Sequence, residues 1–162
     1  MRANKKMILI FSIVVVLVLG VSSVVLSHCE IPCGIYNDPM RLDMIAEDIE
    51  TIEKSMNQIK QISAEKDKDY NQLSRWIMNK EQHADKLSDV VTQYFMKQRI
   101  TPVDKDDKNY ADYVNKLTLL HSMMVYSMKC KQTTDLEYVG KLRNCLAEFR
   151  QAYLGDGSHE HN

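Results

Sequence analysis

Apolar residues recur every three or four positions along four stretches of the chain, which is the spacing of amphipathic helices. The four apolar stripes are Ile45, Ile49, Ile52, Met56, Ile59 and Ile62; Leu73, Trp76, Ile77, Ala84, Leu87, Val90, Val91 and Tyr94; Tyr110, Tyr113, Val114, Leu117, Leu120, Met124 and Met128; and Leu136, Val139, Leu142, Leu146, Phe149 and Tyr153. No stretch after residue 27 shows a convincing strand pattern. The pattern therefore predicts an all-α chain.

Short polar segments and prolines separate the four stripes. Pro39 lies just before the first helix, and residues 63–69 read as a loop. The second helix ends near residues 98–100, because Pro102 disfavours helix at the residue before it. Residues 104–108 form a charged connection. Residues 133–135 (Thr-Thr-Asp) separate the third stripe from the fourth, and Thr134 or Asp135 could cap the final helix.

Four amphipathic helices with short connections predict an antiparallel four-helix bundle, here over residues 39–154. Gly155 ends the last helix, and residues 155–162 are expected to form a flexible tail.

Residues 1–27 have the pattern of a secretory signal peptide. Three basic residues precede an apolar stretch at 7–26, and Val25 and Ser27 suit the −3 and −1 positions of a signal-peptidase site. The leader would direct export of the chain to a periplasm, the extracellular space or an organelle lumen, and its cleavage would make His28 the N-terminus. Two alternatives stay open: an uncleaved membrane anchor, since about twenty residues can span a bilayer, and a lipoprotein signal ending at Cys29.

Removing the leader changes the charge balance. It removes Arg2, Lys5 and Lys6, which leaves 18 basic against 22 acidic residues and a formal net charge of −4. No basic tract is present, so nucleic acid is not an expected partner. The length that remains fits one domain with a real core.

A cluster of metal-binding groups lies at the predicted cut, in the run His28-Cys29-Glu30-Ile31-Pro32-Cys33-Gly34-Ile35-Tyr36. A free amine at His28, the amide nitrogen and thiolate of Cys29, and the thiolate of Cys33 could surround one ion, with the His28 imidazole approaching from above. Square-planar nitrogen and sulfur ligation suits Ni(II) or Cu(II). Residues 28–38 are therefore predicted to form a metal-binding hook.

Two other interpretations of this run are open. A Cys-x-x-x-Cys pair in an exported protein is commonly a disulfide, here between Cys29 and Cys33. Zinc is a second candidate, although one histidine and two cysteines lack the fourth side-chain ligand of structural zinc sites.

The nine-residue run resembles the nickel hook of nickel superoxide dismutase, whose mature N-terminus reads His-Cys-x-x-Pro-Cys-Gly-x-Tyr. The resemblance implies a four-helix bundle assembled as a homohexamer, with one nickel ion per chain cycling between Ni(II) and Ni(III). It implies disproportionation of superoxide to oxygen and hydrogen peroxide. His28, Cys29 and Cys33 would be the metal ligands.

The resemblance also assigns roles to residues that do not bind metal. Pro32 would follow a cis peptide bond. Tyr36 would be a gate tyrosine beside the open axial face, and Tyr94 a second tyrosine lining the pocket; both would order water and restrict access. One departure concerns support of the axial histidine: the family's glutamate position falls at Met44 or Ile45, and His83 occupies an arginine-like position. His83 could therefore support His28 in its place.

The remaining cysteines, Cys130 and Cys145, are not expected to form a disulfide. They lie about 5 Å and about 15 Å along their helices from the Thr133 turn, a mismatch of about 10 Å in a hairpin. We expect two reduced, buried thiols.

Three functions are compatible with these observations. The first is an exported nickel superoxide dismutase. The second is a non-enzymatic exported protein that binds nickel or copper with the same hook. The third is a membrane-anchored helical interaction protein whose leader is never cut, which would lack the free amine at His28.

Overall fold

The computed structural model describes residues 31–155, so the predicted leader, His28, Cys29 and most of the predicted tail lie outside the described residues. The described helices are α2 (Asp38–Ala64), α3 (Tyr70–Asp89), its continuation η1 (Val90–Arg99), α4 (Tyr110–Gln132) and α5 (Glu137–Leu154). The chain divides between Tyr36 and Asn37 into two units, and each is described by itself.

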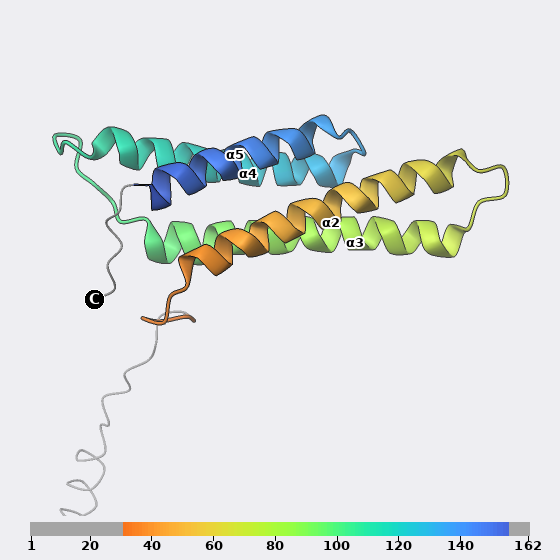
Figure 1. Cartoon of the computed structure of the whole chain (residues 1–162), viewed down its shortest axis with the longest axis horizontal. Helices are drawn as coiled ribbons and strands as arrows, with labels where there is room; N and C mark the ends of the chain where they lie inside the picture. Colours follow the sequence, from red (N-terminus) through yellow and green to blue (C-terminus); the bar gives the residue numbers. More distant parts are fainter. Residues whose placement is uncertain (1–30, 156–162) are drawn as a thin grey trace, which may run out of the picture. The chain divides into compact units, whose positions relative to one another are not determined.

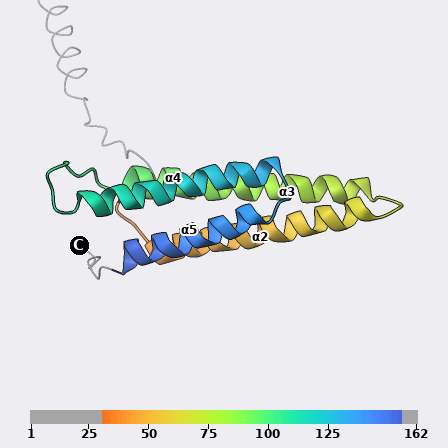
Figure 2. The ribbon, with the colours of Figure 1, turned by 90° about the horizontal axis from the view of Figure 1, so that it is seen from above.

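The helices of the second unit run alternately up and down, as Figures 1 and 2 show. α2 packs on α3, α3 on α4 and α4 on α5, and α5 returns to α2 and closes the bundle. The predicted antiparallel four-helix bundle is confirmed. No helix within residues 31–155 combines the length and the apolar character that a membrane crossing requires.

The helix starts follow from local hydrogen bonding. The Asn37 side chain accepts a hydrogen bond from the Met40 N–H (3.1 Å), and Pro39 occupies the first turn of α2, where a missing N–H costs nothing. Asp69 caps α3 in the same way through the Gln72 N–H (3.0 Å). The N-cap position of α5 is Leu136 rather than the predicted Thr134 or Asp135, but the Asp135 side chain accepts from the N–H of Glu137, the first residue of α5 (3.0 Å).

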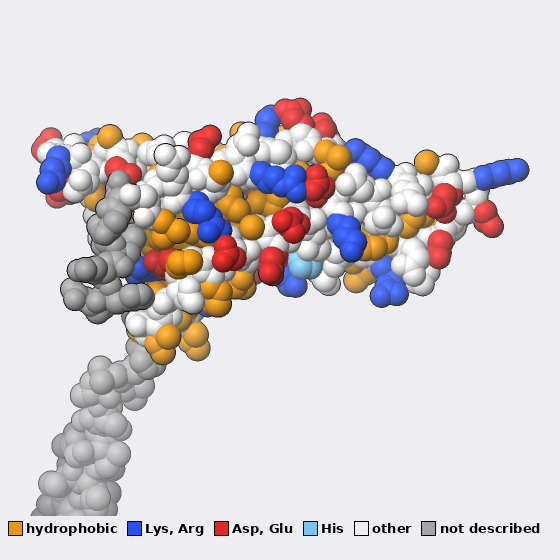
Figure 3. All heavy atoms as spheres, viewed as in Figure 1, with side chains coloured by type: hydrophobic (Ala, Val, Ile, Leu, Met, Phe, Trp, Pro, Cys, Tyr) orange, Lys and Arg blue, Asp and Glu red, His pale blue; other side chains and the backbone are white. Residues whose placement is uncertain are grey.

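The core contains most of the predicted stripe residues, among them Ile45, Ile52, Leu87, Leu120, Leu142 and Phe149, and also Leu42, which no stripe included; all seven are fully buried. Ile77, Val114 and Met128 were assigned to stripes but are about 40–50% exposed (41%, 39% and 47%). Three- and four-residue spacing marks a broad helix face, and the partner helices cover its centre better than its edges. The shallow surface groove between α2 and α5 shows apolar side chains between alternating charges (Figure 3).

The α2–α3 hairpin extends past the α4–α5 connection (Figure 1). Lys80 marks the level where α4 ends, because its ammonium group donates to the carbonyl oxygens of Cys130 (2.8 Å), Lys131 and Thr133 (3.4 Å). These carbonyls end α4 and have no partner within the helix. Lys80 is 4% exposed and therefore caps α4 from inside the bundle.

The second predicted helix ends where expected, at Arg99, but its last ten residues are a π-helix. The Ile100 N–H bonds the Phe95 carbonyl five residues earlier (2.9 Å), which is the π-helical pattern. In an α-helix, residues five apart point about 140° away from each other. In the wider π turn they lie nearly one above the other, so Tyr94 and Arg99, five positions apart in η1, lie on the same side.

Candidate metal centre

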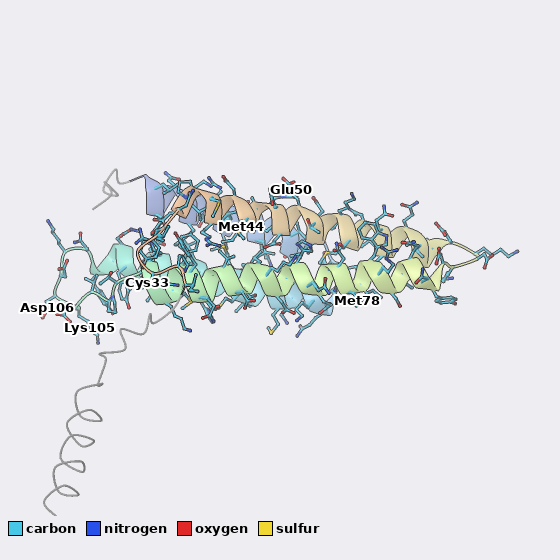
Figure 4. The ribbon with its side chains drawn as sticks, turned by 90° about the horizontal axis from the view of Figure 1, so that it is seen from below. Cys33, Met44, Glu50, Met78, Lys105 and Asp106 are labelled. Atoms are coloured by element: carbon cyan, nitrogen blue, oxygen red, sulfur yellow. The ribbon has the colours of Figure 1, made fainter. Side chains whose placement is uncertain are left out.

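The described part of the hook, residues 31–36, carries the turn that the sequence predicts. The Ile31–Pro32 peptide bond is cis, which confirms the prediction for Pro32, and Gly34 has a φ of +76°, in the left-handed region that favours glycine. Cys33 lies between them, exposed to solvent and free of any disulfide (Figure 4). The predicted ligand thiol is therefore available.

This donor chemistry fits a soft, redox-active metal. A free thiol on a turn can bind as a thiolate, which suits nickel or copper better than calcium or magnesium. The other predicted ligands, His28 and Cys29, lie outside the described residues. Between residues 31 and 155, no group of three or more His, Cys, Asp or Glu side chains is arranged to hold an ion.

Tyr36 is the last residue of the hook unit and is half-buried. It follows Cys33 by three positions in the sequence. Its role as a gate stays a prediction.

Asp38, two residues after Tyr36, is the centre of a buried polar cluster at the start of α2. Its carboxylate accepts hydrogen bonds from Arg99 (Nη2 to Oδ2, 2.7 Å; Nε to Oδ1, 3.0 Å), from the Tyr94 hydroxyl and from the Tyr153 hydroxyl (2.9 Å). Burial by itself would raise the pKa of Asp38, but the Arg99, Tyr94 and Tyr153 hydrogen bonds bring it below its ordinary value. Asp38 is therefore a stable buried anion.

Tyr94 is 3% exposed, and its hydroxyl connects two groups of the same unit. It donates to Asp38 Oδ1 and accepts the backbone N–H of Asn37 (3.0 Å). Burial and the bond to Asp38 raise the pKa of Tyr94 to about 12, so the phenol keeps its proton at neutral pH. The Arg41 guanidinium lies over its ring, 5.0 Å from the centroid. The predicted pocket role of Tyr94 is untested, but its O–H donor is directed at Asp38.

The sequence interpretation did not identify Asp38, Arg99 or Tyr153 as site residues. Asp38 reads as an ordinary acidic residue in a first helical turn, Arg99 as a helix end, and Tyr153 as part of an apolar stripe. The sequence carries only a weak indication of this cluster. Two tyrosines and an arginine lie near helix ends, and those ends meet in an antiparallel bundle. Their convergence on one carboxylate requires the tertiary structure.

His83 pairs with Asp48, its Nδ1 lying 2.6 Å from Asp48 Oδ1 across the α2–α3 interface. Asp48 is 7% exposed, and burial raises its pKa even though His83 hydrogen-bonds to it. Of the two positions that align with the family's glutamate, Ile45 is buried in the core and Met44 is 37% exposed on α2 (Figure 4). Asp48 thus supplies the carboxylate partner of His83. Whether the pair supports His28 stays a prediction.

Cys130 and Cys145 are both free, as predicted. Cys130 is fully buried, and burial raises the pKa of its thiol to about 11. Cys145 is half-buried rather than buried, and burial raises its pKa as well.

Comparison with known proteins agrees with the hook and the bundle. The family model of nickel-containing superoxide dismutase matches residues 23–156, which include the whole hook motif and all the described helices. No curated protein and no solved structure matches the chain. The chain therefore belongs to the nickel-containing superoxide dismutase family, whose members are oxidoreductases with a nickel cofactor and superoxide as substrate.

Proposed function

We propose that this chain is cut after Ser27 and uses His28, Cys29 and Cys33 to hold the nickel ion at which superoxide is dismuted. The observation that carries the proposal is the exposed, free Cys33 thiol on the turn between the cis Ile31–Pro32 bond and Gly34. When bound, nickel supplies the redox chemistry by alternating between Ni(II) and Ni(III). Two superoxide anions and two protons yield one oxygen and one hydrogen peroxide.

The protein supplies the donors and their orientation. Cys33 would bind as the thiolate, so nickel would displace the proton of its thiol. The free amine at His28 must also be unprotonated, which makes leader removal a condition of the site. Tyr36, three residues after Cys33 in the sequence, is proposed to restrict access to the open face of the site.

Export and assembly belong to the same proposal. The leader pattern supports delivery to a periplasm, the extracellular space or an organelle lumen. The family resemblance supports a homohexamer, and Tyr70 (72% exposed) and Met78 (59%; labelled in Figure 4) offer apolar surface for subunit contacts. Native mass spectrometry of the nickel-loaded protein tests the hexamer, and a monomer at working concentration would contradict it.

The first experiment is N-terminal sequencing of the protein from its native source, followed by metal analysis and a superoxide-decay assay. We expect a start at His28, about one nickel per chain and rapid decay. Cys33→Ser should abolish nickel binding and activity, whereas Cys145→Ser, a matched thiol on α5, should leave both intact. A start at Met1 or an active nickel-free protein would overturn the proposal. Tight nickel binding without superoxide decay would instead support a metal-handling protein.

A further inference from the structure

We propose that Asp38 is a positioning residue for the metal site, because it fixes the point at which the hook joins the bundle. It acts through Tyr94 and Arg99. The inference rests on the proposed function and extends it to residues that do not touch the metal.

The junction residue is Asn37, the first residue of the bundle unit. Three of its hydrogen-bonding groups are engaged within that unit. Its N–H donates to the Tyr94 hydroxyl (3.0 Å), its side chain accepts from the Met40 N–H (3.1 Å), and its carbonyl accepts from the Arg41 N–H (3.1 Å). The last two bonds belong to the start of α2, whereas the first ties the junction to η1.

Asp38 determines which way the Tyr94 hydroxyl points. A phenol has one O–H donor, and Tyr94 directs it at the Asp38 carboxylate. The oxygen lone pairs are thereby available to the Asn37 N–H on the other side. Without the carboxylate, the O–H can rotate toward Asn37, where two donors would oppose each other.

Arg99 holds the carboxylate in this orientation. Its guanidinium makes a two-pronged contact with both oxygens of Asp38, which fixes the plane of the carboxylate as a single contact could not. The π-helical turns of η1 make the arrangement possible, since they bring Tyr94 and Arg99, five positions apart, to the same side. A regular α-helix would turn one of them away.

The same helix carries a matched control. Asp43, five residues after Asp38, also accepts a hydrogen bond from an arginine, Arg150 of α5 (2.6 Å). Its side chain is 66% exposed, however, and it lies within α2 rather than at the junction. Asp38→Asn and Asp43→Asn therefore remove the same charge from the same helix, and only the first alters the junction.

The test measures two properties of each variant in the full mature chain. The first is amide hydrogen exchange of the metal-free protein over residues 37–42, and the second is nickel affinity by competition with a chelator. We expect Asp38→Asn to raise exchange in this segment at least about tenfold, with the α4 and α5 amides unchanged. We expect its nickel affinity to fall by about tenfold or more. Asp43→Asn should match the wild type in both.

Three results would overturn the inference. Unchanged exchange and affinity in Asp38→Asn would show that the junction does not depend on the carboxylate. Equal loss of protection in all helices would show a general structural role. An equal fall in affinity for Asp43→Asn would show an effect of charge alone.

If Asp38→Asn fails to fold, Tyr94→Phe replaces it as the test variant. Tyr153→Phe is then the control, because it removes a phenol from Asp38 but keeps the Tyr94 oxygen that accepts from Asn37. A wild type that binds no nickel would contradict the proposed function, whatever the exchange rates.

Discussion

The hydroxyl of Tyr153, in the last turn of α5, donates a hydrogen bond to Oδ2 of Asp38, 115 residues earlier in the chain (2.9 Å). The bond joins the end of α5 to the start of α2. The rings of Phe95 and Phe149 pack beside Tyr153, with centroids 5.4 Å and 5.3 Å from its own. Residues of α2, η1 and α5 therefore meet at one carboxylate, at the end of the bundle where α2 begins.

Acid should weaken this cluster selectively. The pKa of Asp38 is lower in the folded protein than its ordinary 3.8, so the unfolded state binds more protons between the two values. The stabilisation by Asp38 is therefore complete above pH 3.8 and is lost as the pH falls through the folded pKa. Asp38→Asn should lower the free energy of unfolding by about 2–4 kcal/mol at pH 7 and by much less at about pH 2. Urea unfolding at both pH values measures this, and a constant difference between the proteins would contradict it.

Alkaline pH should remove the stabilisation that Tyr94 provides, just as acid removes that of Asp38. Its folded pKa of about 12 exceeds the ordinary 10, so the folded state binds more protons between these values. The stabilisation is therefore present below pH 10 and lost as the pH rises through about 12. Ultraviolet titration of phenolate should show a late-ionising group that is missing in Tyr94→Phe. Tyr153 also ionises late, since burial and Asp38 raise its pKa, and must be separated by Tyr153→Phe.

Replacing Lys80 with methionine should destabilise the bundle strongly. Methionine fills similar space but leaves the carbonyls of Cys130, Lys131 and Thr133 without their buried donor. We expect a loss of about 2–4 kcal/mol in the free energy of unfolding, because charged hydrogen bonds vanish and buried acceptors stay unpaired. Lys141→Met is the control: Lys141 bonds Glu137 on the surface of α5, and its loss should have little effect. Equal effects of the two substitutions would contradict the capping role.

The three described cysteines should react with an alkylating agent in a fixed order. In the reduced, metal-free protein at pH 8, the exposed Cys33 should react first, half-buried Cys145 later and buried Cys130 last. The reactive form is the thiolate, and the Cys130 thiol, with a pKa of about 11, is almost fully protonated at that pH. Peptide mass spectrometry gives the order. Nickel should protect Cys33 alone among the three, and protection of Cys145 would argue against the hook.

The sequence predicted the bundle because helix formation and burial leave a local mark. The three- and four-residue spacing of residues such as Ile45, Ile49 and Ile52 follows directly from 3.6 residues per turn. The candidate ligands were also local: His28, Cys29 and Cys33 lie within six positions, so the hook could be recognised before any fold was known.

The tertiary structure decided what surrounds the start of the bundle. Asp38, the Tyr94–Arg99 pair and Tyr153 come from three helices far apart in the sequence, and no spacing rule links the three helices. The π-helical stretch η1 was equally hidden, since the apolar spacing of its residues did not set it apart from the helix before it. Likewise, Asp48 became the partner of His83 only when α2 packed against α3. A periodic sequence determines which face of a helix is buried, but the polar groups that meet there depend on the alignment of the helices.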